Sequence, residues 1–150
     1  MRLLMVSPHL PHPSWGAGMR SYHLLKALAR AHRVSLLALV GGGKGEHECA
    51  LLAELTQTLR VVSRAPGAQK RWQQLASTFR GRSYLLDSYV LPELQHELDA
   101  MLSGNSYDAV LFESVFMAGY RLPEAMPVII DEHNIEYELL DRTYQHEKGW

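Results

Sequence analysis

The sequence predicts an α/β fold: a Rossmann-like parallel sheet with helices on both faces. Short, almost continuously apolar segments alternate along the chain with longer segments whose apolar residues recur at helical spacing. Continuous apolar strands are typical of parallel sheets that are covered on both sides. Because helices separate the strands, the connections are crossovers, and five parallel strands are expected in one sheet within a single domain.

The individual elements follow from the positions of the apolar residues and of the helix-ending residues. Strands are expected at residues 3–6, 34–40, 59–62, 109–112 and 128–130. Helices are expected over about 19–31, 46–58, 91–102 and 114–120, and after Asn134. Pro92 is expected in the first turn of its helix, and Gly104 is expected to cap the end of that helix.

The composition is that of an ordinary globular domain. The 150 residues are 47% hydrophobic and 21% charged, which is enough for a stable core. Cys49 is the only cysteine, which excludes an intramolecular disulfide and favours a reducing compartment. Neither a signal peptide nor an apolar run of membrane-spanning length is present, so a cytoplasmic protein is expected.

Charge is divided unevenly between the two halves of the chain. Residues 1–82 hold 12 of the 15 Lys and Arg but only 3 of the 16 Asp and Glu. The first half therefore either faces an anionic partner, such as a phosphorylated substrate or a membrane, or has a polarised solvated surface.

The basic stretch at residues 68–82 carries Trp72 and Phe79 at helical spacing. This pattern favours an ordinary packed helix, with peripheral contact to anionic lipid at the inner face of the membrane as the alternative. No nucleic-acid-binding motif accompanies the charges, so nucleic acid is not expected as a partner.

The first strand leads into a proline-rich segment that ends in Gly16-Ala17-Gly18. Glycines before a helix start gather backbone N–H groups and the positive helix end, which suits an anion or a sugar hydroxyl. The alternative is that the glycines only serve turn conformations. The pattern is GxGxxS, beginning nine residues after Ser7, and no acidic residue ends the second strand. An NAD site is therefore not expected, and no cofactor is predicted.

A second motif, Asp131-Glu132-His133-Asn134, follows the fifth strand. Asn134 suits a helix N-cap, and Asp131 could orient the imidazole of His133. A purely structural role, with capping and a loop hydrogen bond, is the alternative. Ser7, His9 and Asp131 could also be imagined as a hydrolase triad, but no GxSxG elbow supports it. No metal site is expected, because His47 and Cys49 have no second ligand pair nearby.

Three segments, taken in their order along the chain, resemble the N-terminal, acceptor-side half of a family-4 glycosyltransferase with the GT-B fold. The first part is the segment MRLLMVSPHLPHPSWGAGMRSYHLLKALARAHRVSLLAL. The later parts are YDAVLFES and VIIDEHNIEYELLDR, where the family often shows an Asp-x-His-Asn-x-Glu sequence. The resemblance covers nearly the whole chain.

The resemblance implies a retaining, metal-independent transferase that moves a sugar from a nucleotide-diphosphate sugar to a polysaccharide or glycolipid acceptor. It implies that His133 is catalytic, in contact with the transferred sugar. The substrate-binding residues that it implies are Gly16, Ala17, Gly18, Arg20, Glu113 and Asn134.

The family's second domain, which holds the donor, is not among these residues. We therefore expect this chain alone to be inactive or nearly so, and an exposed cleft-facing surface would allow it to form a homodimer. The alternative is a stand-alone flavodoxin-like or nucleotide-binding regulatory module without catalysis.

Overall fold

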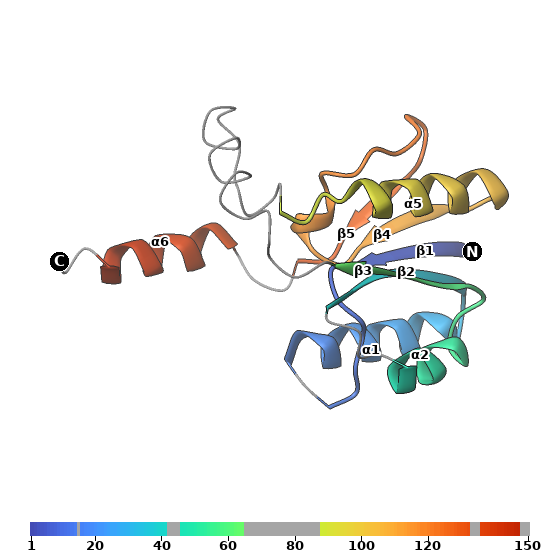
Figure 1. The fold of residues 1–150 in the computed structure, drawn as a ribbon, viewed down its shortest axis with the longest axis horizontal. Helices are drawn as coiled ribbons and strands as arrows, with labels where there is room; N and C mark the ends of the chain where they lie inside the picture. Colours follow the sequence, from blue (N-terminus) through green and yellow to red (C-terminus); the bar gives the residue numbers. More distant parts are fainter. Residues whose placement is uncertain (15, 42–45, 65–87, 133–135, 148–150) are drawn as a thin grey trace.

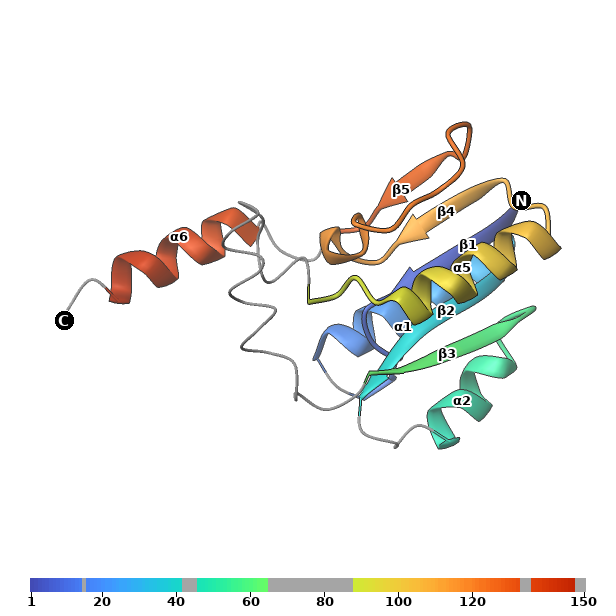
Figure 2. The same cartoon turned by 45° about the horizontal axis from the view of Figure 1, so that its top comes forward.

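The structure is a computed structural model, and the residues described are 1–14, 16–41, 46–64, 88–132 and 136–147. Its strands are β1 (Arg2–Ser7), β2 (Arg33–Gly41), β3 (Leu59–Arg64), β4 (Ala109–Phe112) and β5 (Val128–Ile130). They form a five-stranded sheet in which every pairing is parallel (Figure 2). The expected α/β fold is confirmed.

The order of the strands is β3-β2-β1-β4-β5. The chain moves outward from β1 to β3, then returns to the other side of β1 and continues to β5. The strand order therefore reverses between β1 and β4. An order of 3-2-1-4-5 matches the first five positions of the Rossmann order 3-2-1-4-5-6, whereas the flavodoxin-like order is 2-1-3-4-5. The topology of the sheet is therefore not flavodoxin-like.

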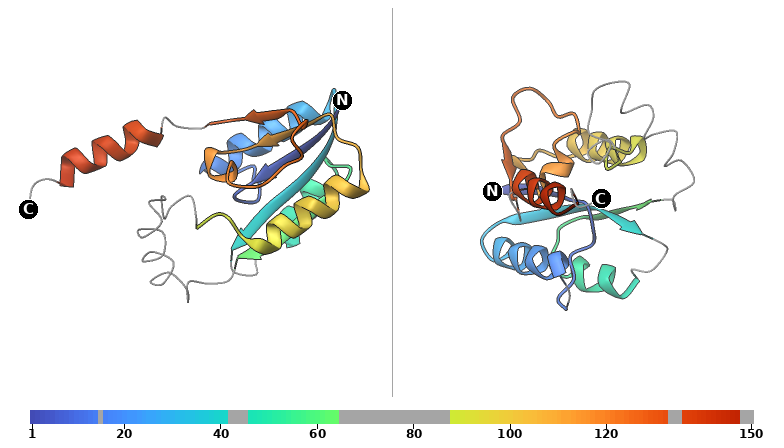
Figure 3. Two further views of the ribbon diagram at one scale, coloured as in Figure 1. Left: turned by 90° about the horizontal axis from the view of Figure 1, so that it is seen from above. Right: turned by 90° about the vertical axis from the view of Figure 1, so that its left-hand side faces the viewer.

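Helices lie on both faces of the sheet (Figure 1). One face carries α1 (Gly16–Ala29) and α2 (Glu46–Ala53), and the other carries α5 (Pro92–Gly104). A short 3-10 helix, η1 (Val115–Met117), follows β4. The last helix, α6 (Glu136–Glu147), lies away from the sheet in Figure 1 and in the left-hand view of Figure 3. Among the described residues, no helix has the length and apolar character needed to cross a membrane.

Successive residues of β1 pack into different layers of the core. Leu3 and Met5 belong to the apolar cluster that includes Leu25 of α1, whereas Leu4 and Val6 belong to the cluster under α5. All four strand residues are buried because helices cover both sides of the central strand. This arrangement explains why the sequence of the strand is continuously apolar rather than alternating.

Several element boundaries differ from those expected. Helix α1 begins at Gly16 rather than near Met19, so the glycines form its first turn. Helix α2 ends at Ala53, because the chain after it already pairs with β2: the Thr58 carbonyl accepts from Leu36 N–H at 2.8 Å.

Two further expectations concern residues 114–120 and the end of α5. Only the 3-10 turn Val115–Met117 forms in the first of these segments. Gly104 is the last helical residue of α5, and Asn105 is its C-cap. The helix expected within residues 68–82 lies outside the described residues.

Candidate functional site

The carboxyl ends of β1, β4 and β5 meet at one edge of the sheet. In-register parallel pairing brings Ser7, Glu113 and Asp131 to this edge, and we call these three residues the strand-end rim. Backbone pairing continues into the rim, because Glu113 N–H donates to the Val6 carbonyl at 3.0 Å and Asp131 N–H donates to the Phe112 carbonyl at 2.9 Å. The rim spans the point between β1 and β4 where the strand order reverses, which is the usual ligand position in open α/β sheets.

Glu113 is fully buried at the centre of the rim. The Ser7 hydroxyl donates to its Oε2 at 2.7 Å, and the Ser21 hydroxyl of α1 donates to its Oε1. The Nε2 atom of His9 lies 3.6 Å from Oε2 and 3.1 Å from the Ser21 hydroxyl. We call these four residues the Glu113 cluster.

Each hydroxyl of the Glu113 cluster also reaches a backbone carbonyl. Ser7 Oγ lies 2.7 Å from the His9 carbonyl, and Ser21 Oγ lies 2.9 Å from the Ala17 carbonyl. A hydroxyl has one proton, so it donates to the carboxylate or to the carbonyl at any moment. Burying a carboxylate is costly unless hydrogen-bond donors surround it. The cluster therefore favours one placement of α1 on the strand ends, with Ser7 from β1, Glu113 from after β4 and Ser21 from α1 in contact.

This geometry corrects one expectation from the sequence and also excludes the hydrolase triad, which the sequence had not supported. Glu113 does not reach the surface, so the ligand contact expected of it is not supported, and it is better described as an internal anchor. Ser7 is fully buried as well, with its hydroxyl directed at Glu113 and the His9 carbonyl. A buried serine with these partners cannot attack a substrate, so the Ser7, His9 and Asp131 triad is wrong.

The glycine segment forms the first turn of α1, beside the rim. Gly16 has a φ of +42°, which a residue with a side chain rarely adopts. Gly18 packs against the preceding loop: its carbonyl accepts from His12 N–H at 2.9 Å, and a Cβ at Gly18 would lie 3.3 Å from His12. The backbone conformation at Gly16 and the close packing at Gly18 therefore explain why glycine is found at both positions. Gly16 and Ala17 are exposed at the start of the helix.

Arg20 connects α1 to the end of β5. Its Nη2 atom lies 2.5 Å from Oδ1 of Asp131, and the exposed fractions of the two side chains are 52% and 20%. The Asp131 carboxylate accepts from the guanidinium of Arg20, and the orienting role that Asp131 could have toward His133 stays a prediction. His133 and Asn134 lie outside the described residues, so the roles implied for them stay predictions.

A hollow of about 350 Å³ lies beside the rim, over the ends of β1, β2 and β3. Its polar lining includes His9, His12, Glu48 and Arg64. His12 and Glu48 form an ion pair at 3.7 Å when the imidazole is protonated, and Arg64 is held by a hydrogen bond of 3.0 Å to the Ser88 carbonyl. His9 belongs both to this hollow and to the Glu113 cluster, so it joins the buried carboxylate to the surface.

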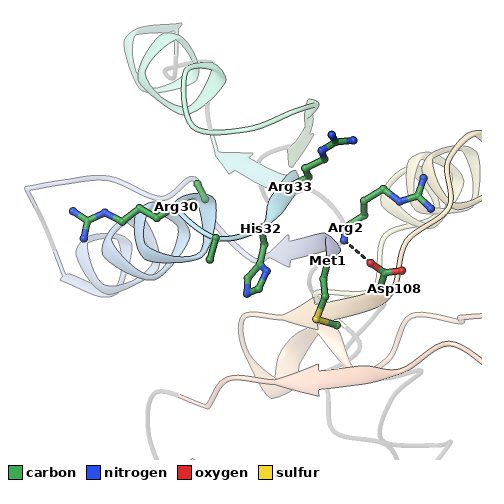
Figure 4. Close-up of a pocket in the computed structure, with 8 residues that line it drawn as sticks. Met1, Arg2, Arg30, His32, Arg33 and Asp108 are labelled. Carbon is green, nitrogen blue, oxygen red and sulfur yellow. Dashed lines mark hydrogen bonds between the residues drawn. The ribbon is translucent and has the colours of Figure 1, made fainter.

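A larger hollow of about 510 Å³ lies at the opposite edge of the sheet. Figure 4 shows that Arg30 at this hollow points away from Arg2 and Arg33, so the three guanidinium groups do not converge on one ligand position. Asp108 accepts from the Arg2 backbone N–H at 2.6 Å. We therefore place the candidate site at the strand-end rim and not at this hollow.

Of the Glu113 cluster, only Glu113 is among the site residues predicted from the sequence, and Ser7, His9 and Ser21 are not. Ser21 lies at the same helical spacing as Leu24, Leu25 and Leu28, so the sequence pattern places it in the apolar stripe of its helix. A hydroxyl on a buried stripe needs a polar partner, and an acidic residue directly after a neighbouring apolar strand is a candidate for that partner. Ser21 in the apolar stripe and Glu113 directly after an apolar strand together indicate that Glu113 is buried.

Metal ligands and related proteins give no further assignment. Across the described residues, no group of three or more His, Cys, Asp or Glu is placed to hold a metal ion. Comparisons of the chain with protein-family models, with curated protein sequences and with solved structures find no match.

Proposed function

We propose that these residues form the acceptor-side domain of a retaining glycosyltransferase with the GT-B fold. The complete enzyme would transfer a sugar from a nucleotide-diphosphate sugar to a polysaccharide or glycolipid acceptor. The observation that carries the proposal is the strand-end rim, where the exposed start of α1 and the ends of β4 and β5 lie beside the reversal of the strand order. The order of the sequence segments described above supports the same assignment.

Each part of the rim has a role in this proposal. The exposed Gly16 and Ala17 offer the positive start of α1 to a phosphate or to an acceptor hydroxyl. His133 contacts the transferred sugar, and the Glu113 cluster holds α1 in place. A second domain holds the donor, because transfer requires a positioned sugar and a stabilised leaving phosphate.

The proposal is tested by sugar transfer in the polypeptide encoded by the complete reading frame that contains this chain. His133→Ala should lower turnover by about 100-fold or more, as expected when a group that contacts the reacting sugar is removed. His96→Ala, an exposed histidine on α5, is the matched control and should leave turnover unchanged. Unchanged turnover in His133→Ala would remove this residue from the site.

A nucleotide-binding regulatory module remains the alternative of a different class. Titration of UDP-glucose and GDP-mannose into this chain by calorimetry separates the two proposals. Because the donor pocket belongs to the second domain in our proposal, we expect no saturable binding at micromolar concentrations. Micromolar binding by this chain alone would favour the regulatory module.

We also propose that the enzyme works in the cytoplasm, with residues 68–82 touching the inner face of the membrane. The support is the basic and aromatic composition of this stretch, which lies outside the described residues. Sedimentation with anionic vesicles at low salt should pellet the chain, and high salt should release it. Analytical ultracentrifugation of the same sample tests the proposed homodimer.

A further inference from the structure

The end of β5 has few pairing and packing contacts within the described sheet. The strand has three residues, and among the described strands it pairs only with β4. Val128, Ile129 and Ile130 are 46–50% exposed, whereas every residue of β4 is buried. Apolar burial therefore contributes little to fixing where β5 ends.

Among the described residues, two contacts connect Asp131, which follows β5, to β4 and to α1. The Asp131 N–H donates to the Phe112 carbonyl at 2.9 Å, which extends the pairing with β4 by one residue. The Asp131 carboxylate lies 2.5 Å from the guanidinium of Arg20, a residue 111 positions away in the chain. The next residue of α1, Ser21, hydrogen-bonds to Glu113 after β4. Adjacent residues of one helix turn are thus attached to the ends of adjacent strands.

We infer that Arg20 is a positioning residue, and that the Arg20–Asp131 pair is a clasp that holds the end of β5 against α1. The pair is partly exposed, so the clasp is weak and can open while the rest of the sheet stays folded. This role differs from the substrate contact that the family resemblance implies for Arg20, and it does not depend on the proposed enzymatic function.

Hydrogen exchange at single backbone amides, measured by NMR on this chain, tests the clasp. In Arg20→Ala and in Asp131→Asn, the Asp131 amide should exchange about two- to five-fold faster, as expected for a partly exposed ion pair. The Glu113 amide, which donates to the Val6 carbonyl, should exchange at its original rate. Arg30→Ala removes an exposed arginine just after α1 and is the matched control, with no effect expected at Asp131.

Two further measurements separate a charge interaction from a general loss of structure. The exchanged pair Arg20→Asp with Asp131→Arg should restore slow exchange at residue 131. In the unaltered chain, 0.5 M NaCl should accelerate exchange at Asp131, and it should have no such effect in Arg20→Ala. Unchanged exchange at Asp131 in both single variants, or salt dependence that persists in Arg20→Ala, would overturn the clasp. Neither result bears on sugar transfer, so the two proposals fail separately.

Discussion

Arg20 and Ser21 are neighbours on α1, and each contacts a carboxylate that directly follows a strand. Ser21 meets Glu113, which is fully buried, while Arg20 meets Asp131 in a partly exposed pair. Water competes for the exposed pair and screens it, so such pairs contribute little to stability. Removing a partner from a buried carboxylate instead leaves polar groups without solvation. We therefore expect that burial, more than formal charge, decides which contact fixes the position of α1 on the strand ends.

The largest expected effect is that of removing the buried carboxylate. Glu113→Ala should lower the free energy of unfolding by about 3 kcal/mol, because it removes the acceptor shared by two hydroxyls and leaves a cavity. Urea denaturation followed by circular dichroism measures the change. Glu113→Gln keeps the volume and one oxygen and should cost less. Glu124→Ala, at an exposed glutamate, should change stability by no more than about 0.5 kcal/mol.

A smaller effect is expected where α1 packs on the loop before it. Gly18→Ala should cost about 1–3 kcal/mol, because the new Cβ would lie 3.3 Å from the His12 backbone nitrogen and Cβ. Gly104→Ala is the matched control, since nothing lies within 4 Å of a Cβ there. Equal denaturation midpoints for the two variants would show that the loop yields and that Gly18 is not needed for packing.

The buried hydroxyl of Tyr120 is neutral, and its removal is expected to have an effect between those at Glu113 and at Arg20. Tyr120 donates to the Tyr89 carbonyl at 2.5 Å and accepts from Leu91 N–H at 3.0 Å. Burial raises the pKa of this phenol above its usual 10.0, against the opposing effect of the Leu91 N–H. Since the folded state binds the proton more tightly, this contribution to stability is complete below about pH 10 and declines as the pH rises further.

Tyr120→Phe should therefore lower stability by about 1 kcal/mol at neutral pH and remove part of the alkaline loss. Denaturation midpoints at pH 7 to 11 measure both effects. An unchanged alkaline slope in this variant would mean that other groups cause the loss.

The smallest effect is expected at the exposed pair. Arg20→Ala should lower the free energy of unfolding by no more than about 1 kcal/mol, and high salt should reduce the difference. Arg30→Ala serves again as the control in the same denaturation experiment. If Arg20→Ala destabilises the chain as much as Glu113→Ala, the contrast between the two contacts is wrong.

The sheet could be predicted from the sequence because its strands carry an unambiguous local signal. Leu3 to Val6 are consecutive apolar residues and are all buried, as is typical of a strand between two helical layers. Residues 128–130 carry the same signal but are half-exposed at the edge of the described sheet. The pattern therefore predicted the strand but not its surroundings.

The candidate site was predictable only in outline. The rim followed from parallel topology, which places strand ends together, but the burial of Glu113 depends on which side of α1 faces β4. In the structure, the Ser21 hydroxyl of α1 faces Glu113. In the sequence, Ser21 lies in a leucine-rich stripe, which does not indicate this contact. The sequence predicts that α1 begins near Met19, because glycines usually disfavour helices. In the structure, Gly16 and Gly18 belong to its first turn.

The most direct measurement is a pair of double-mutant cycles on the free energy of unfolding. One cycle combines Ser21→Ala with Glu113→Gln, and the other combines Arg20→Ala with Asp131→Asn. We predict a coupling energy of about 1–2 kcal/mol for the buried contact and less than about 1 kcal/mol for the exposed pair. A coupling near zero between Ser21 and Glu113, or one smaller than that of the exposed pair, would contradict the central role of the buried carboxylate.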